Sequence, residues 1–189
     1  MKSSVARRIP FRAMNLEYIE DRNVGPELDA ELRQLLSTCF TGGANEIFRH
    51  QRFFSEMPAH RWVARNDEGR LAAHLAVHDK IVGTSAGDLR VGGIAEVCVD
   101  PSHRGQGLVR QLLALSDDWM IKQGIPFGIL LGKKEVYGSS GYRHADNPVR
   151  YLVPSTGEWL EQSFSYFLIK SLGAIDWPTG GIDLRGPKF

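Results

Sequence analysis

The stretch "VDPSHRGQGLVRQLL" (residues 99–113) joins two different local patterns. It begins at the end of an apolar run rich in β-branched residues and ends in leucines spaced for one face of a helix. Between the two patterns lie Arg104, Gly105 and Gly107, with no acidic residue among them. The stretch therefore predicts a strand, a glycine turn and a helix, in that order.

A glycine turn that opens a helix is suited to binding an anion. The first N–H groups of a helix have no intrahelical partner, and the helix dipole places partial positive charge there. Gly105 and Gly107 would let backbone N–H groups approach an anion with no Cβ in the way. The structural alternative is a tight surface turn without a ligand. "RGQG" (104–107) lacks both the GK[ST] of a Walker sequence and the third glycine of a dinucleotide fingerprint, so neither a nucleoside triphosphate nor NAD is indicated.

Composition predicts one ordinary globular domain. The 189 residues are 42% hydrophobic and 24% charged, and a net charge of +1 gives no field that would attract nucleic acid or a membrane surface. No apolar run approaches the ~18 residues of a spanning helix, so we expect a cytoplasmic protein. Residues 1–14 are expected to be a flexible lead and residues 15–189 the domain. Cys39 and Cys98 are far apart and outside any metal-ligand spacing, so neither a disulfide framework nor a metal site is expected.

The order of elements predicts an α+β fold with a strand–helix–strand unit in its middle. Gly92 and Gly93 lie inside a predicted strand, which they would weaken unless the strand bends or another group approaches its backbone. The periodicity predicts two longer helices, at 25–40 and 105–124, and two short ones, within 43–54 and 133–142. Strands are predicted at 15–20, 61–67, 70–82, 89–100, 126–131, 149–153 and 163–170.

Two spaced motifs resemble one family. "IAEVCVDPSHRGQGLVRQLL" (94–113) resembles the strand–turn–helix signature of the GNAT superfamily of acyl-CoA-dependent N-acyltransferases, Arg/Gln-x-x-Gly-x-Gly/Ala. Arg104 and Gly107 match this signature, and Val109 stands where a small residue is usual. "VYGSSGY" (136–142) resembles the family's Tyr-x-x-x-Gly-aromatic segment, in which the tyrosine sits beside the thioester sulfur. The resemblance covers roughly residues 60–145.

The resemblance implies a three-layer α/β/α fold whose mixed, twisted, mostly antiparallel sheet splays at two central parallel strands. It also implies acetyl-CoA as the acyl donor, held between those strands with its diphosphate on the glycine turn. A backbone N–H of residues 97–99 would polarise the thioester carbonyl, and the same strand edge would pair with the pantetheine amides. The residues predicted to bind the cofactor are Val97, Cys98, Val99, Arg104, Gly105, Gln106, Gly107, Leu108 and Val109.

Two side chains are candidates for acid–base catalysis. An alkylammonium with a pKa of ~10.4 must lose a proton before it can attack a thioester. Glu96 interrupts an apolar strand, where a carboxylate is costly without a role or a partner, and it is the candidate base, with an ordered water as the alternative. Tyr137 is the candidate acid for the departing thiolate. The structural alternatives are that Glu96 faces outward or pairs with an arginine, and that Tyr137 is a core residue. His74 and His78 are interpreted as structural histidines rather than a metal pair.

The tail carries the pattern that bears on the acceptor. "GAIDWPTGGIDL" (173–184) resembles the C-terminal D-W-x-x-G stretch of aminoglycoside 2′-N-acetyltransferases, and it differs from that stretch beyond Gly180. "RLAAHLAV" (70–77) is similar to nodulation-type acyltransferases, which acylate an aminosugar. These resemblances imply acetyl transfer to a small-molecule amine or aminosugar by direct attack in a ternary complex. Asp176, Trp177 and Asp183 would contact the acceptor. A peptide N-acetyltransferase, a non-catalytic acyl-CoA sensor and a homodimer remain open alternatives.

Overall fold

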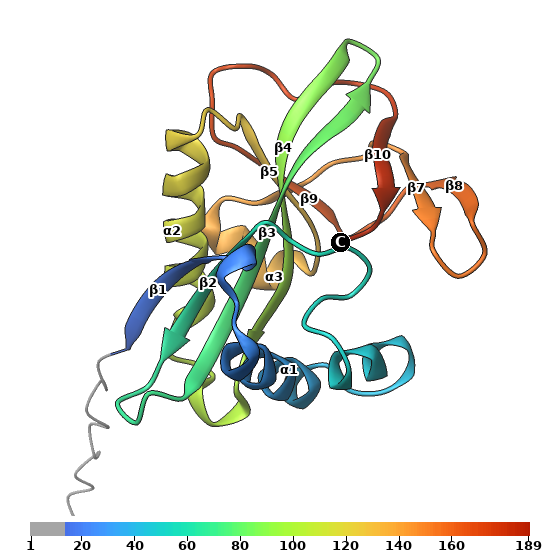
Figure 1. The fold of residues 1–189 in the computed structure, drawn as a ribbon. Coiled ribbons are helices and arrows are strands. Elements are labelled where there is room, and N and C mark those ends of the chain that lie inside the picture. Colours follow the sequence, from blue (N-terminus) through green and yellow to red (C-terminus); the bar gives the residue numbers. More distant parts are fainter. Residues whose placement is uncertain (1–13) are drawn as a thin grey trace, which may run out of the picture.

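The computed structural model describes residues 14–189 (Figure 1). The lead expected over residues 1–14 lies outside the described residues, except for Met14. The strands are β1 (Asn15–Glu20), β2 (His60–Arg65), β3 (Leu71–Thr84), β4 (Gly87–Val99), β5 (Phe127–Leu131), β6 (Arg143–His144), β7 (Val149–Val153), β8 (Glu158–Gln162), β9 (Phe167–Ser171) and β10 (Ile182–Pro187). The helices are α1 (Pro26–Cys39), α2 (Leu108–Lys122) and α3 (Lys134–Tyr137), with short 3-10 turns η1 (Asp21–Asn23), η2 (Gly43–Arg49), η3 (Pro101–His103) and η4 (Gly138–Ser140).

All ten strands belong to one mixed sheet. Its main path runs β6-β9-β5-β4-β3-β10-β7-β8, and β1 and β2 extend it beside β3. The pairs β4–β5 and β10–β7 are parallel, and the other pairs are antiparallel. The long hairpin of β3 and β4 forms the middle of the molecule (Figure 1). The sheet is thus mixed and mostly antiparallel, as the family resemblance implied.

Helices cover both faces of the sheet. Leu108, Leu112 and Met120 of α2 are buried against β2, β3 and β4, so the leucine stripe read from the sequence is the face that α2 packs onto the sheet. Burying one such side chain contributes roughly 1.5–3 kcal/mol. On the opposite face, Leu35 and Leu36 of α1 pack with Cys98 of β4. This gives the three layers that were predicted (Figure 1).

Two adjacent glycines in β4 accommodate groups on opposite faces. A Cβ on Gly92 would overlap the side chain of Met120 from α2. A Cβ on Gly93 would lie 2.8 Å from the ring of Phe189, on the other face. The sequence offered a bend or a close neighbour as the reason for glycines in this strand. The structure shows close neighbours, because the side chains of Met120 and Phe189 pack directly on the backbone.

The two central parallel strands separate after three residue pairs. Gly92, Gly93 and Ile94 of β4 pair with β5, and the ladder ends there. One step later the pairing of β4 with β3 shifts register, because Glu96 adopts a left-handed conformation with φ 53° and adds an extra residue on β4. This β-bulge bends the strand where the sheet opens. The end of β4 is therefore left without β5 as a neighbour.

The C-terminal third differs most from the sequence prediction. The predicted strand at 163–170 begins only at Phe167, because Phe164 turns into the core and its carbonyl accepts a hydrogen bond from the N–H of Phe167. The Gly/Pro-rich tail, read as irregular, contains β10, in which Ile182 and Leu184 are buried. In residues 14–189 no helix combines the length and apolar character needed to cross a bilayer.

Candidate active site

A cavity of about 480 Å³ opens where β4 leaves β5. Its wall comes from the end of α1, the second half of β4, the glycine turn, the start of α2, and α3. All the residues that the sequence assigns to the cofactor line it, and Tyr137 joins them. The lining residues are Cys39, Phe40, Val97, Cys98, Val99, His103, Arg104, Gly105, Gln106, Gly107, Leu108, Val109, Val136 and Tyr137.

The glycine turn has the geometry of an anion cradle. Gly105 and Gly107 lie in the left-handed region, with φ 77° and 72°, and both stand in open space where a side chain would project. Because of these angles α2 begins only at Leu108, three residues later than the periodicity predicted. The first N–H groups of α2, which no intrahelical carbonyl can reach, therefore open beside the cavity. The Arg104 guanidinium donates a 3.4 Å hydrogen bond to the carbonyl of Val99 and adds positive charge at the same edge.

The Glu96 carboxylate is buried and lies outside the wall of this cavity. Its side chain is 4% exposed and does not line the cavity, whereas the next two residues of β4 do. Oε1 accepts a 2.8 Å hydrogen bond from the Phe54 N–H, and Oε2 lies 3.4 Å from the Arg61 guanidinium. Burial raises the pKa of Glu96 to about 7, although the charge of Arg61 opposes this shift. A carboxyl group with this pKa can accept and return a proton near neutral pH.

A fully paired polar network holds the bulge in place. Arg61, completely buried, donates from Nε to Asp21 at 2.6 Å and from Nη1 to His74 Nε2 at 2.9 Å. Because that nitrogen accepts, the His74 proton resides on Nδ1, which donates to the Glu96 carbonyl at 2.9 Å. Burial lowers the pKa of His74 to about 3, so the ring is neutral. Arg52 completes the network with a second ion pair to Asp21 at 2.5 Å. Pairing with an arginine, named as an alternative role for Glu96, is therefore present in the structure.

Tyr137 ends the short helix α3 and lies in the cavity wall. Its ring packs over Gly132, where an added Cβ would approach the ring to 2.5 Å, and edge-on to Tyr142 at 6.2 Å. Burial, with a smaller contribution from Cys98, raises the pKa of Tyr137 to about 12. The phenol is therefore protonated at neutral pH and able to donate.

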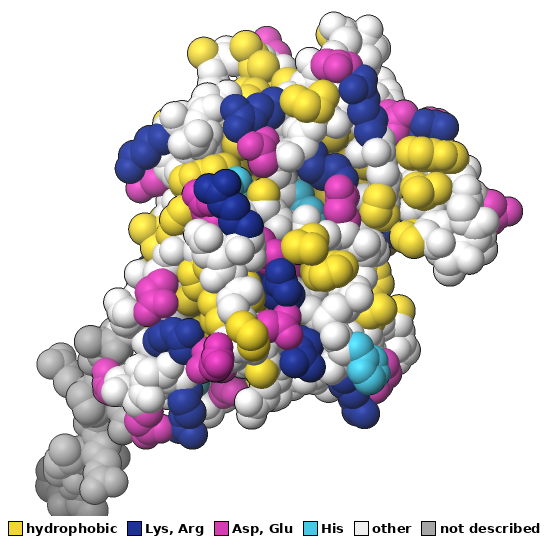
Figure 2. Space-filling model, viewed as in Figure 1, with side chains coloured by type: hydrophobic (Ala, Val, Ile, Leu, Met, Phe, Trp, Pro, Cys, Tyr) yellow, Lys and Arg dark blue, Asp and Glu magenta, His cyan; other side chains and the backbone are white. Residues whose placement is uncertain are grey.

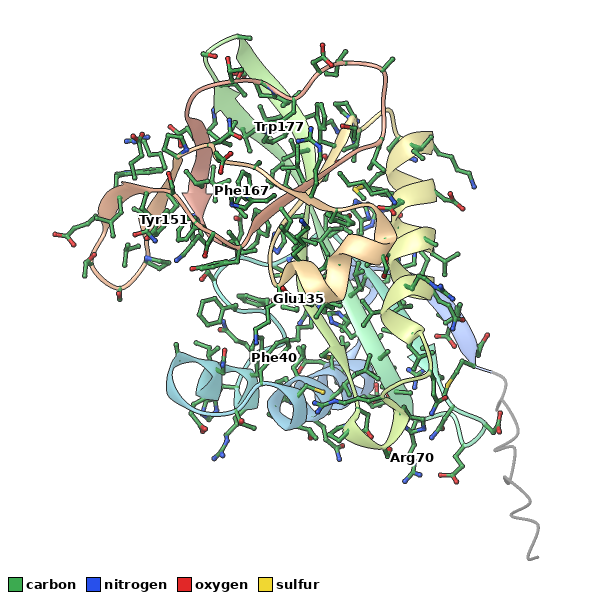
Figure 3. All side chains as sticks on the ribbon, turned by 180° about the vertical axis from the view of Figure 1, so that it is seen from behind. Phe40, Arg70, Glu135, Tyr151, Phe167 and Trp177 are labelled. Atoms are coloured by element: carbon green, nitrogen blue, oxygen red, sulfur yellow. The ribbon has the colours of Figure 1, made fainter. Side chains whose placement is uncertain are left out.

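The residues predicted to contact the acceptor lie elsewhere. Asp176 and Trp177 line a separate hollow of about 560 Å³. The Trp177 ring packs at 4.9 Å against Phe127, the first residue of β5, whereas the cofactor cavity opens beyond the other end of that strand. Phe40, which lines the cofactor cavity, and Trp177 lie on opposite sides of α3, where Glu135 is labelled (Figure 3).

Asp183 is also outside the cavity. It lies on β10, where its carboxylate pairs with Arg150 at 2.6 Å. The structure thus brings together the predicted cofactor residues and Tyr137 in one cavity wall. Glu96 is buried next to this wall in β4, directly before Val97. It does not bring Asp176, Trp177 or Asp183 to this site.

Sequence reasoning missed four residues of the cavity wall. Cys39 and Phe40 come from the end of α1, and only long-range packing brings that helix end against β4. Val136 could have been inferred from its position beside Tyr137, and His103 from its position beside Arg104. In the described chain no group of three or more His, Cys, Asp or Glu residues could hold a metal ion.

His74 and His78 share a strand face but differ in their partners. Both ring nitrogens of His74 are hydrogen-bonded. His78 is 3% exposed, and its ring is tilted against the Phe189 ring with the centroids 5.4 Å apart. Its Nε2 has no hydrogen-bond partner among residues 14–189. Burial lowers the pKa of His78 to about 3, so this ring is neutral as well.

Comparison with known sequences identifies a family. Residues 22–145, about two thirds of the chain, match the model of the "Acetyltransferase (GNAT) domain". An uncharacterized N-acetyltransferase of Escherichia coli K12, YhbS, is 34% identical over 83 residues, which is 44% of this chain and 48% of that protein. The aligned part of the chain thus spans about half the length of the curated relatives it matches.

Solved structures share the fold over most of the chain. The crystal structure of E. coli YhbS in complex with CoA superposes with a TM-score of 0.64 and 25% identity, covering 92% of this chain and 89% of that one. A GNAT family acetyltransferase from Brucella melitensis in complex with acetyl-CoA gives a TM-score of 0.59 at 20% identity, covering 89% and 94% of the two chains.

Proposed function

The chain belongs to the GNAT family of acetyltransferases, and we propose that it moves an acetyl group from acetyl-CoA to the primary amine of a small molecule. One observation carries the proposal. A single cavity gathers the left-handed glycine turn, the open edge of β4 and the Tyr137 phenol, and the buried Glu96 directly precedes the residues of β4 that line it.

The residues of the cavity fit the cofactor. The N–H groups that open α2, freed of side chains at Gly105 and Gly107, suit a diphosphate, and the Arg104 guanidinium adds charge. Beyond Ile94, the edge of β4 that leaves β5 can pair with amide groups of the pantetheine arm. Bound acetyl-CoA supplies the activated acetyl thioester.

Glu96 and Tyr137 divide the proton transfers. With a pKa of about 7, Glu96 is substantially ionised at neutral pH and accepts the proton of the acceptor ammonium, directly or through a water. A backbone N–H of residues 97–99 polarises the carbonyl under attack. Tyr137 gives its proton to the departing thiolate. The amine attacks while both substrates are bound, so no acyl-enzyme is formed.

Enclosure of Glu96 favours a small acceptor. The segment between η2 and β2 crosses the sheet in front of β3 and β4, shown in teal in Figure 1, and its Phe54 N–H is bonded to the carboxylate. An acceptor must therefore reach Glu96 past a covering segment. A small amine can do so more readily than a residue on a folded protein surface. On the face shown in Figure 2, acidic and basic side chains are interspersed, and no extensive single-sign patch is visible to dock a highly charged macromolecule.

Titration of acetyl-CoA followed by a thiol-release assay tests the proposal. We expect saturable binding of acetyl-CoA by calorimetry, and acetyl-CoA-dependent release of free CoA thiol with some members of a panel of small amines and aminosugars. Absence of acetyl-CoA binding would overturn the cofactor assignment. Turnover with peptides alone would overturn the acceptor class, and binding without turnover on any amine or peptide would favour the non-catalytic sensor.

A further inference from the structure

The two cysteines of the chain meet in the cavity wall. Cys39 is the last residue of α1 and Cys98 lies on β4, so they are remote in sequence and come from opposite sides of an interface between a helix and the sheet. Both line the cofactor cavity, and both belong to the same apolar cluster as Phe48 and Leu36. Since the sequence contains only these two cysteines, any disulfide within the chain would have to join them.

The two thiols lie in the same part of the cavity wall and are chemically unequal. Cys98 is 6% exposed. The interaction with the Cys98 thiol, together with the nearby Arg104 guanidinium, lowers the pKa of Cys39, whereas the interaction with Cys39 and burial raise the pKa of Cys98. Cys39 is half-buried, and its S–H donates a 3.4 Å hydrogen bond to the carbonyl of Val99, the residue that follows Cys98. The arrangement offers one partly accessible thiol that ionises more readily and a second, buried thiol near it.

The acetyl-transfer chemistry uses neither thiol. Glu96 and Tyr137 supply the proton transfers, and in the described part of the chain no metal cluster includes a cysteine. Packing alone accounts for a buried Cys98, because cysteine behaves as a small apolar side chain. Packing does not account for the exposure of Cys39 to the cavity or for the presence of both cysteines in one part of its wall.

We propose that Cys39 and Cys98 form a peroxide-reactive dithiol that closes to a disulfide across the wall of the cofactor cavity. The Cys39 sulfur attacks one oxygen of the peroxide, so that an S–O bond forms, the O–O bond breaks and one water leaves. Cys98 then attacks the Cys39 sulfur, forming the S–S bond and releasing the hydroxyl group, which takes the Cys98 proton and leaves as a second water. The two sulfurs together lose two electrons, and the peroxide gains them.

Formation of the disulfide would be coupled to binding of the cofactor. Cys39 is reached through the cavity that it lines, so acetyl-CoA bound there, as the proposed function requires, covers it. A disulfide also fixes the end of α1 to β4, and Phe40, the next residue, lines the same cavity. Bound acetyl-CoA therefore disfavours formation of the disulfide, and by linkage the disulfide lowers the affinity for acetyl-CoA.

The first experiment treats the reduced, full chain with hydrogen peroxide and follows free thiols, intact mass and linked peptides. We expect the wild type to lose both thiols together and to yield a peptide pair joined through Cys39 and Cys98, reversible by dithiothreitol. Cys98→Ser should stop at a Cys39 sulfenic acid, trapped by dimedone. Cys39→Ser should keep its remaining thiol reduced. Independent oxidation of the two thiols without a linked peptide would overturn the proposal, as would a disulfide between two chains on a non-reducing gel.

The second experiment repeats the wild-type reaction with acetyl-CoA. At about ten times Kd, closure should slow about tenfold, because only free protein reacts. An unchanged rate in protein shown to bind acetyl-CoA would overturn the coupling. Because the thiol and mass measurements require no acetyl transfer, failure of the dithiol and failure of the proposed enzyme activity give different results.

Discussion

The network around Glu96 and the glycine turn before α2 are both polar regions next to β4, but the network is buried with its hydrogen-bonding groups paired, whereas the turn is exposed and its N–H groups are open. Around Glu96, the side chains of Asp21, Arg61 and His74 are bonded to one another. At the glycine turn, the N–H groups that open α2 have no carbonyl within the helix to accept from them.

The difference separates positioning from binding. A buried group that loses its partner carries the full cost of desolvation, so the paired network defines one arrangement of the bulge and of the Glu96 backbone. A backbone N–H that is left open can bond a ligand without first breaking a bond inside the protein. Five substitutions test this distinction, starting with the largest expected effect.

Replacing Glu96 by Gln should lower kcat about 10³-fold, close to 4 kcal/mol in barrier, because the amide keeps the size of the carboxyl group but cannot take the proton. Thiol release from acetyl-CoA measures the loss, and calorimetry should show acetyl-CoA binding within about twofold of wild type. Glu158→Gln, on the exposed strand β8, is the matched control and should leave kcat unchanged.

The pH profile provides a second test of Glu96. A base must be deprotonated to act, and burial raises the pKa of this group to about 7. Wild-type kcat/KM should therefore fall as the pH drops through 7, and Glu96→Gln should lose this limb of the profile. A limb that persists in the variant would assign the titration to another group and leave Glu96 as part of the structural network alone.

Tyr137→Phe should lower turnover roughly 10²-fold while the affinity for CoA changes little, because one proton donor is lost and the ring is kept. We expect the Tyr137 phenol to be protonated across the pH range of the assay, since burial raises the pKa of Tyr137 to about 12. Tyr166→Phe removes the hydroxyl of an exposed tyrosine and should have no effect. Unchanged turnover in Tyr137→Phe would remove this residue from the mechanism.

His74→Leu and His78→Leu compare two rings on one face of β3. Both nitrogens of His74 are hydrogen-bonded, whereas Nε2 of His78 has no hydrogen-bond partner among the described residues. His74→Leu should lower the free energy of unfolding by about 2–4 kcal/mol, because it leaves Arg61 and the Glu96 carbonyl with one buried bond fewer each. His78→Leu should change it by less than about 1 kcal/mol, since its Nε2 has no partner to lose among the described residues. Urea unfolding with a common m-value measures both. Equal losses would contradict the contrast between the two rings.

Gly107→Ala should weaken acetyl-CoA binding about 5–10-fold, because a residue with a Cβ costs roughly 1–2 kcal/mol in the left-handed conformation that the turn requires. Gly69→Ala is matched in backbone angle, with φ 75° and open space around it, but lies in the hairpin between β2 and β3. Both variants should lose similar stability. A comparable loss of cofactor affinity in Gly69→Ala would show that the effect is not local to the turn.

Local pattern was enough to predict most of the residues that line the candidate cavity. The glycine turn, the apolar face of α2, the buried strand β5 and the neighbourhood of Tyr137 all lie within one continuous stretch, where spacing and residue type determine the structure. Glu96 stood out because a carboxylate inside an apolar strand needs a partner. The partners themselves, Arg61 and the Phe54 N–H, could not be read from the sequence, because they arrive from remote segments.

In the tail, local pattern did not predict where the side chains lie relative to the cavity. Asp176 and Trp177 were assigned to an acceptor because of a short resemblance, yet Trp177 donates to Asn147 at 2.7 Å and packs on the start of β5. An aromatic side chain with a polar atom satisfies the same local pattern whether it binds a ligand or closes a core. Strand β10 was not predicted either, because Gly and Pro residues surround it and it pairs with β3 and β7, which are remote in sequence.

The adjacent glycines of β4 have a consequence for how this chain can vary. At Gly92 and Gly93 the strand is backbone alone, with the Met120 thioether on one side and the Phe189 ring on the other. A methyl group at either position has room only if position 120 or position 189 becomes smaller at the same time. Among relatives that keep this packing, residues at 92 and 120, and at 93 and 189, should therefore change in pairs.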